Sequence, residues 1–174
     1  MSDLILGVDP SLTATAYLAM TPAGQVVTKS VARGKDLRGA ERLDFHDVYL
    51  QAIIEDIDPA FVVIEGYAYG RQNQRETLGE HGGVLRLRLW RAGIPTMVVA
   101  PPTLKKFVTG KGSCPKSIMI KEVYRRWSFD TDDDNLADAY SLAQVGRAWL
   151  NPDTRSKTLE SILKKALLLS GASK

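Results

Sequence analysis

Apolar residues in the first part of the chain occur in short runs typical of β-strands, separated by turn signals. Residues 4–8 form a nearly continuous apolar run, and residues 13–20 are rich in β-branched and aromatic side chains. A Thr-Pro-Ala-Gly turn at residues 21–24 leads into a third run at residues 25–31. Three strands joined by short turns predict an antiparallel meander.

The rest of the chain alternates helical periodicity with two further apolar strands. Apolar residues recur at helical spacing within residues 41–57, and Asp58-Pro59 ends that helix. The later predicted elements are strands over residues 61–64 and 94–100 and helices over residues 76–91, 103–108, 116–127, 135–150 and 158–169. This order predicts an α/β fold: a mixed five-stranded sheet of three antiparallel and then parallel strands, with right-handed crossovers and helices on both faces.

Length and composition indicate one compact domain with a short appendage. The chain has 174 residues, 44% apolar and 25% charged, against about 150 residues for an average domain. We expect one main domain over residues 1–150 and a helical extension over residues 151–174. Cys114 is the single cysteine, which excludes a disulfide framework and a cysteine-rich zinc site. No apolar run is long enough for a membrane span and no signal-peptide pattern precedes Asp9, so we expect a soluble, cytoplasmic protein.

The distribution of charge says more than its total. There are 23 basic and 20 acidic residues, a net charge of +3, which alone predicts little about partners. Residues 105–126 hold seven lysines or arginines against a single acid, Glu122, and an acidic cluster follows at once at residues 130–134. A basic stretch beside an acidic cluster indicates a polyanion held next to a cation site.

Four carboxylates fall where the predicted fold would bring them together. Asp9 ends the first strand and Glu65 ends the first strand after a helix, and sites in such sheets form just beyond strand ends. Asp134 and Asp138 are four residues apart on a predicted helix, so they share one face. If that helix packs beside the two strand ends, all four acids meet.

Such a cluster requires neutralisation. Two carboxylates about 4 Å apart repel by roughly 4 kcal/mol at an effective dielectric near 20, so their pKa values rise or cations bind. Oxygen ligands favour Mg²⁺ or Mn²⁺, and a pair of such ions suits phosphodiester hydrolysis. The ordinary alternative is that each acid is a turn residue or a helix-terminal acid. Asp138 argues against it, because it lies in an apolar stretch where an unpaired carboxylate is costly.

Four segments, in this order, resemble the RuvC family of Holliday junction resolvases in the ribonuclease H-like superfamily. They are LILGVDPS at residues 4–11, VVIE at 62–65, the basic LKKFVTGKG at 104–112 with Lys116-Ser117, and NLADA at 135–139. The resemblance covers roughly residues 3–149. It implies a ribonuclease H-like fold and a crossover junction endodeoxyribonuclease that acts in DNA recombination and repair.

The resemblance also implies a mechanism and partners. The chain would resolve four-way DNA junctions by paired symmetric nicks as a homodimer, using two Mg²⁺ ions for which Mn²⁺ substitutes. The metal ligands would be Asp9, Glu65, Asp138 and Asp134, and Lys105 and Lys116 would assist cleavage. The residues expected to contact DNA are Tyr67 or Tyr69 as a base-contacting aromatic, and Arg71, Arg75, Lys106 and Lys111 on phosphates.

The sequence departs from the family pattern at the last acidic motif. Asn135 stands three residues before Asp138, where the family has an acid, and the acid here is Asp134. We expect Asp134 to be the fourth ligand, because two divalent ions require carboxylates, and Asn135 is the alternative. Ser11 stands where a glycine is common, which favours a divergent, phage-encoded member. Other functions in the same fold are a nuclease for other branched DNA or RNA–DNA hybrids and a catalytically silent DNA-binding module.

Several residues outside these motifs carry structural expectations. Glycines in the helix at residues 76–91 indicate close approach of another backbone, either a second copy or the sheet; they are Gly79, Gly82 and Gly83. His46 and His81 are expected at the surface or as cap residues, His81 with a weak case for DNA contact. The tryptophans are expected in the core; they are Trp90, Trp127 and Trp149.

Overall fold

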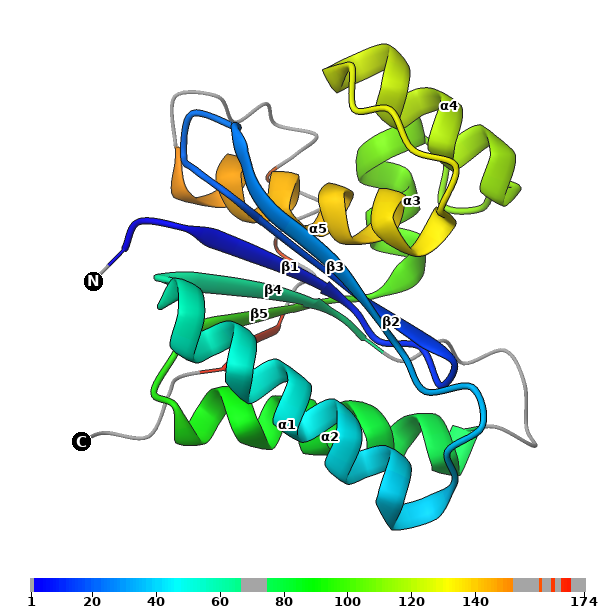
Figure 1. Cartoon of the computed structure of the whole chain (residues 1–174). Helices are drawn as coiled ribbons and strands as arrows, with labels where there is room; N and C mark the ends of the chain where they lie inside the picture. The colour runs from blue at the N-terminus through cyan, green and yellow to red at the C-terminus, as the bar shows by residue number, and fades with distance from the viewer. Residues whose placement is uncertain (1, 67–74, 152–159, 161–163, 165–166, 170–174) are drawn as a thin grey trace.

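One mixed sheet organises the molecule. The structure, a computed structural model, describes residues 2–66, 75–151, 160, 164 and 167–169 (Figure 1). Within these residues the strand order is β3-β2-β1-β4-β5-β6. β2 is antiparallel to both of its neighbours, β1 and β3. β4 and β5 run parallel to β1, and β6 is antiparallel to β5. The strands are β1 (Ile5–Asp9), β2 (Ala14–Met20), β3 (Val26–Arg33), β4 (Phe61–Glu65), β5 (Thr96–Val99) and β6 (Leu167–Leu169).

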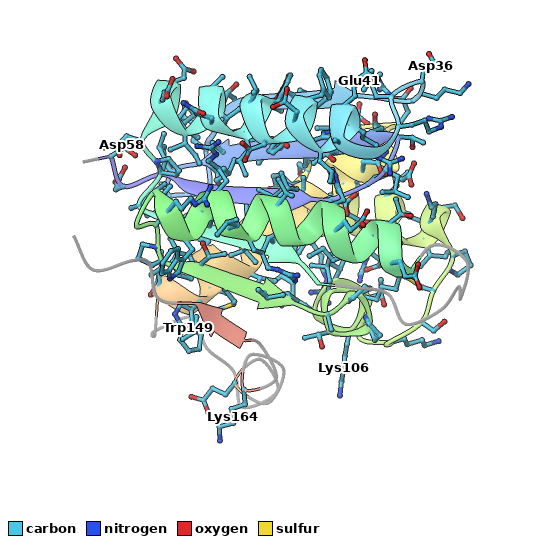
Figure 2. The ribbon with its side chains drawn as sticks, turned by 90° about the horizontal axis from the view of Figure 1, so that it is seen from below. Asp36, Glu41, Asp58, Lys106, Trp149 and Lys164 are labelled. Carbon is cyan, nitrogen blue, oxygen red and sulfur yellow. The ribbon has the colours of Figure 1, made fainter. Side chains whose placement is uncertain are left out.

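Helices cover both faces of this sheet. α1 (Gly39–Ile57) and α2 (Arg75–Arg91) lie side by side on one face, as Figure 2 shows, and α5 (Asp134–Leu150) lies across the other. α3 (Pro101–Thr109) and α4 (Lys116–Trp127) pack on the α5 side. Each face has its own apolar core, one around Ile5, Val63 and the alanines of α5 and one around Val8, Leu50 and Leu89.

The alternation of side chains along β1 decides what lies on each face. Leu6 and Val8 belong to the core under α1 and α2, whereas Ile5 belongs to the core under α5. With a period of two, Gly7 and Asp9 also face α5. The C-terminal end of β1, which carries Asp9, therefore packs against α5, the helix that carries the last acidic motif.

The predicted fold class is confirmed, since the five expected strands and the helices on both faces are present. The expectation of a helix over residues 158–169 is wrong at its end, because Leu167–Leu169 forms β6. Its backbone pairs with β5 in the register Thr96↔Leu169 to Val98↔Leu167, which satisfies polar groups that an uncovered edge strand would leave open. None of the helices in the described residues is long and apolar enough to cross a bilayer.

Three single-residue expectations are also wrong. His46 and His81 are fully buried rather than at the surface, because α1 and α2 turn them toward the sheet. Trp90, expected in the core, is 48% exposed on α2.

Candidate active site

Two carboxyl groups meet where β1 and β4 end. The parallel register pairs Val8 with Ile64, so Asp9 and Glu65 lie beside each other at the next position, on the α5 face. Asp9 is buried, and its carboxyl group shares a hydrogen bond with that of Glu65. The sheet thus holds two acids beside each other at the C-terminal ends of neighbouring strands, β1 and β4, which run toward the right in Figure 1.

A glycine allows α5 to approach this edge closely. A Cβ atom at Gly7 would lie 2.0 Å from the carbonyl oxygen of Ala139 and 2.7 Å from the nitrogen of Ala143. The backbones of β1 and α5 therefore touch with no side chain between them. Asp138, which precedes Ala139, is held within electrostatic reach of Asp9 and Glu65 by this packing.

Burial and mutual repulsion shift the pKa values of these acids upward. Burial and then the charges of Glu65 and Asp138 raise the pKa of Asp9 well above its usual value. Burial and then the Asp138 charge raise the pKa of Glu65 to about 8. Burial and then the Asp134 charge raise the pKa of Asp138 to about 6. Full ionisation of these three acids is unfavourable in this buried place, so the site favours the binding of protons or cations.

Lysines from two other helices face the cluster. Lys105 of α3 is half-buried, and its charge lowers the pKa values of Glu65 and Asp138, partly offsetting their burial. Lys116, at the start of α4, forms an ion pair with Asp134, and the Asp134 carboxylate raises the pKa of the ammonium group. The charges of Asp138 and Asp9 also raise the pKa of Lys116. Both lysines thus interact electrostatically with the acid cluster.

The start of α5 is held by residues that sequence reasoning missed. Asp133 is its N-cap, accepting hydrogen bonds from the backbone nitrogens of Asn135 and Leu136 at 2.9 and 3.3 Å. Arg33, at the end of β3, donates to the same carboxylate at 3.0 Å. Asn135 also donates its side-chain amide to Asp133 at 3.3 Å. An Asp directly before a helical run is a recognisable cap signal, but its partner on a distant strand is not readable from the sequence.

The chemistry of the donor set fits divalent cations that prefer oxygen. Asp9, Glu65, Asp138 and Asp134 supply carboxylate oxygens, with no sulfur donor among the groups that shift their pKa values. Among the described residues, no three acidic, imidazole or thiol groups already stand in metal-binding positions. Asp9, Glu65 and Asp138 are the residues that could hold such an ion, and its charge would compete with the proton that Asp9 and Glu65 share.

The predicted DNA-contacting residues are only partly described. Tyr67, Tyr69 and Arg71 lie outside the described residues, and Arg75 is the first residue of α2. Lys106 is exposed on α3, where Figure 2 shows it pointing away from the body of the protein, and Lys111 is exposed in the loop that follows.

Comparison with known proteins finds one family. The family model described as "Crossover junction endodeoxyribonuclease RuvC" matches residues 5–145. The curated protein of that name from Synechococcus sp. (strain WH7803) is 28% identical over 148 residues, covering 82% of this chain and 96% of the relative. The one from Chlamydia trachomatis serovar L2 is 29% identical over 155 residues, covering 82% and 90%.

Solved structures share the fold. T. thermophilus RuvC in complex with Holliday junction substrate has a TM-score of 0.73 at 20% identity, covering 88% of this chain and 98% of that chain. The fowlpox virus resolvase in complex with substrate Holliday junction DNA has a TM-score of 0.55 at 14% identity, covering 84% and 98%.

Proposed function

The chain belongs to the RuvC family of crossover junction endodeoxyribonucleases, and from this membership we propose that it resolves four-way DNA junctions by hydrolysis of backbone phosphodiesters. It belongs with divalent-metal-dependent nucleases, and we propose two Mg²⁺ ions at the carboxylate cluster, with Mn²⁺ as a substitute. The observation that carries the proposal is the contact of Asp9 with Glu65 beside Asp138, with raised pKa values for all three acids. Burying three mutually repelling carboxyl groups at neighbouring strand ends costs stability, and bound cations would offset that cost.

Each acid has a distinct part in holding the reaction centre. Asp9 and Glu65, fixed by paired strands, form the rigid side of the site, and Asp138 closes it from α5. We take Asp134 as the fourth ligand and keep Asn135 as the alternative, since both lie at the N-terminus of α5. Divalent cations bound there would polarise the attacking water and offset the charge on the departing 3′ oxygen.

The lysines act on the phosphate. Lys105 lies close enough to the acids for its charge to lower the pKa values of Glu65 and Asp138, which partly offsets the effect of burial. Lys116 is largely exposed and pairs with Asp134, and its ammonium group would exchange this partner for a DNA phosphate and stabilise charge that develops during cleavage. Lys106 and Lys111 extend the positive surface for backbone contacts.

The same proposal covers the residues and the assembly that contact DNA. Tyr67 or Tyr69 would stack on an unpaired base, and Arg71 and Arg75 would hold phosphates near it. Two symmetric nicks need two copies of the site, so we propose a homodimer. α2 can supply the contact, because a Cβ at Gly83 would meet nothing within 4 Å among the residues that the structure describes. We further propose that residues 1–150 are the nuclease domain, with residues 151–174 as an extension, and that the enzyme acts in the cytoplasm.

Cleavage of synthetic substrates tests the function. Wild-type protein with MgCl₂ should nick a labelled four-way junction at symmetric positions and leave linear duplex and RNA–DNA hybrid intact. Asp9→Asn should bind the junction with unchanged affinity in metal-free buffer and fail to cut it. Asp56→Asn, which changes an exposed acid near the end of α1, is the matched control and should cut normally. Wild-type-like cutting by Asp9→Asn would refute the assignment, and preferential cutting of the hybrid would favour a ribonuclease H activity.

A further inference from the structure

A buried threonine holds the turn that follows Asp9. The turn spans residues 10–13, between β1 and β2. The Thr15 hydroxyl donates to the Ser11 carbonyl oxygen at 3.0 Å and accepts from the Ser11 nitrogen at 3.3 Å. One side chain therefore binds both backbone polar groups of a residue two positions after Asp9. Thr15 itself is completely buried.

A buried histidine on α2 completes this arrangement. His81 is 1% exposed, and its Nε2 atom lies 3.0 Å from the Thr15 hydroxyl oxygen. Because the single hydroxyl proton of Thr15 goes to Ser11, Nε2 must carry a hydrogen and donate it to Thr15. Burial and then the neighbouring His46 charge lower the pKa of His81 to about 4, so the ring is neutral near pH 7 and carries its one hydrogen on Nε2.

This chain of contacts reaches the site from the opposite face of the sheet. Thr15 is two residues from Tyr17, which packs in the core under α1 and α2, so it shares that face, whereas the Asp9 side chain faces α5. Asp9 pairs with Ala16, the neighbour of Thr15. The contacts thus hold the backbone that follows Asp9, and Thr15 adjoins its strand partner Ala16, without a contact to the Asp9 carboxyl group.

We propose that Thr15 and His81 are positioning residues that fix the turn after Asp9 and thereby aim its carboxylate at the metal site. The inference rests on the proposed function and deepens it. A turn that lost these bonds would remain folded through the β1–β2 pairing, but the backbone that follows Asp9 would be held less tightly, and the direction of the Asp9 carboxylate would be less closely fixed. Groups that orient a metal ligand from behind typically contribute about 10- to 100-fold to affinity or rate.

Isosteric substitutions separate positioning from stability. Thr15→Val removes the hydroxyl at constant shape, and Thr15→Ser retains it. His81→Leu removes the donor, and His81→Gln places an amide donor at a similar distance. The matched control is Thr96→Val, because Thr96 is also buried and its hydroxyl donates to the Ile94 carbonyl at 3.0 Å, at the far end of β5 from the site.

The readouts are single-turnover cleavage of a four-way junction, junction affinity in metal-free buffer, and the MgCl₂ concentration that half-saturates the rise in melting temperature. Thr15→Val should lower the rate and weaken Mg²⁺ binding by about 10-fold or more, with junction affinity unchanged. Thr15→Ser and His81→Gln should recover most of both. Adding His81→Leu to Thr15→Val should cause little further loss, because the two residues act in one chain.

The inference is overturned if Thr15→Val matches Thr96→Val in rate and in Mg²⁺ midpoint while both remain folded. If His81→Leu does not fold, Thr15→Val and His81→Gln decide the matter. If wild-type protein neither cuts junctions nor responds to MgCl₂, the proposed function itself fails, and this inference with it. If wild-type protein cuts junctions and Thr15→Val changes neither the cleavage rate nor the Mg²⁺ midpoint, only the positioning role is refuted.

Discussion

Replacing Gly7 with alanine should separate α5 from the sheet at the level of the active site. The new Cβ atom would lie 2.0 Å from the Ala139 carbonyl oxygen and 2.7 Å from the Ala143 nitrogen. Both are backbone atoms of a helix, so no side-chain rotation relieves the overlap. To restore even a 3.0 Å contact, α5 must retreat by about 1 Å, and Asp138, next to Ala139, moves with it. A misplacement of about 1 Å can cost about 100-fold in rate.

The cost in stability should be moderate in comparison. Overpacking of a tight core typically costs about 1–3 kcal/mol, so the variant should fold at room temperature. The assay is single-turnover cleavage of a labelled four-way junction, together with thermal unfolding. We expect a loss of about 100-fold in rate, with junction affinity retained.

Gly146→Ala is the matched control for this experiment. Its Cβ would meet methyl groups of Ile5 and Val63 at 2.7 and 2.8 Å, which strains the same helix against the same sheet at the opposite end of β1 from Asp9. It should lose stability and cut close to the wild-type rate. The reasoning is refuted if folded Gly7→Ala cuts as fast as wild type, or if both variants lose activity equally.

Two further predictions concern the acids. Because the folded-state pKa of Glu65 is raised from 4.5 to about 8, the metal-free protein binds more protons folded than unfolded, and its free energy of unfolding should fall as pH rises through this window. The buried histidines act in the opposite sense only below their ordinary pKa of 6.5. MgCl₂ should therefore raise the melting temperature more at pH 8 than at pH 6.5, and an equal or smaller rise at pH 8 would contradict the account. Asp134→Asn should lower the cleavage rate and weaken Mg²⁺ binding more than Asn135→Ala does; the reverse order would assign the fourth ligand to Asn135.

Features that depend on residues close together in the sequence could be predicted from it. The apolar runs that end at Asp9 and at Glu65 predicted both strand ends, and the alanine-rich stretch predicted a helix over residues 135–150, one residue short of the observed start at Asp134. Convergence of the acids required only that parallel strands end at one edge and that one helix packs over it. Those are general rules of α/β sheets.

Features that depend on distant partners were beyond the sequence. Leu167–Leu169 has no local preference that separates strand from helix, and its conformation is set by the open edge of β5. His81 bonds to Thr15, 66 positions earlier, so its burial follows from how α2 packs on β2. Gly7 was predicted only as part of a strand motif, although its missing side chain is what admits α5.

The central claim is that acids far apart in the sequence form one divalent-cation site. A crystal structure of the protein soaked in MnCl₂, with anomalous scattering recorded for manganese, tests it most directly. We expect anomalous peaks bounded by Asp9, Glu65 and Asp138, with Asp134 or Asn135 at their side. Manganese bound elsewhere, with the Asp9–Glu65 contact undisturbed, would contradict the claim.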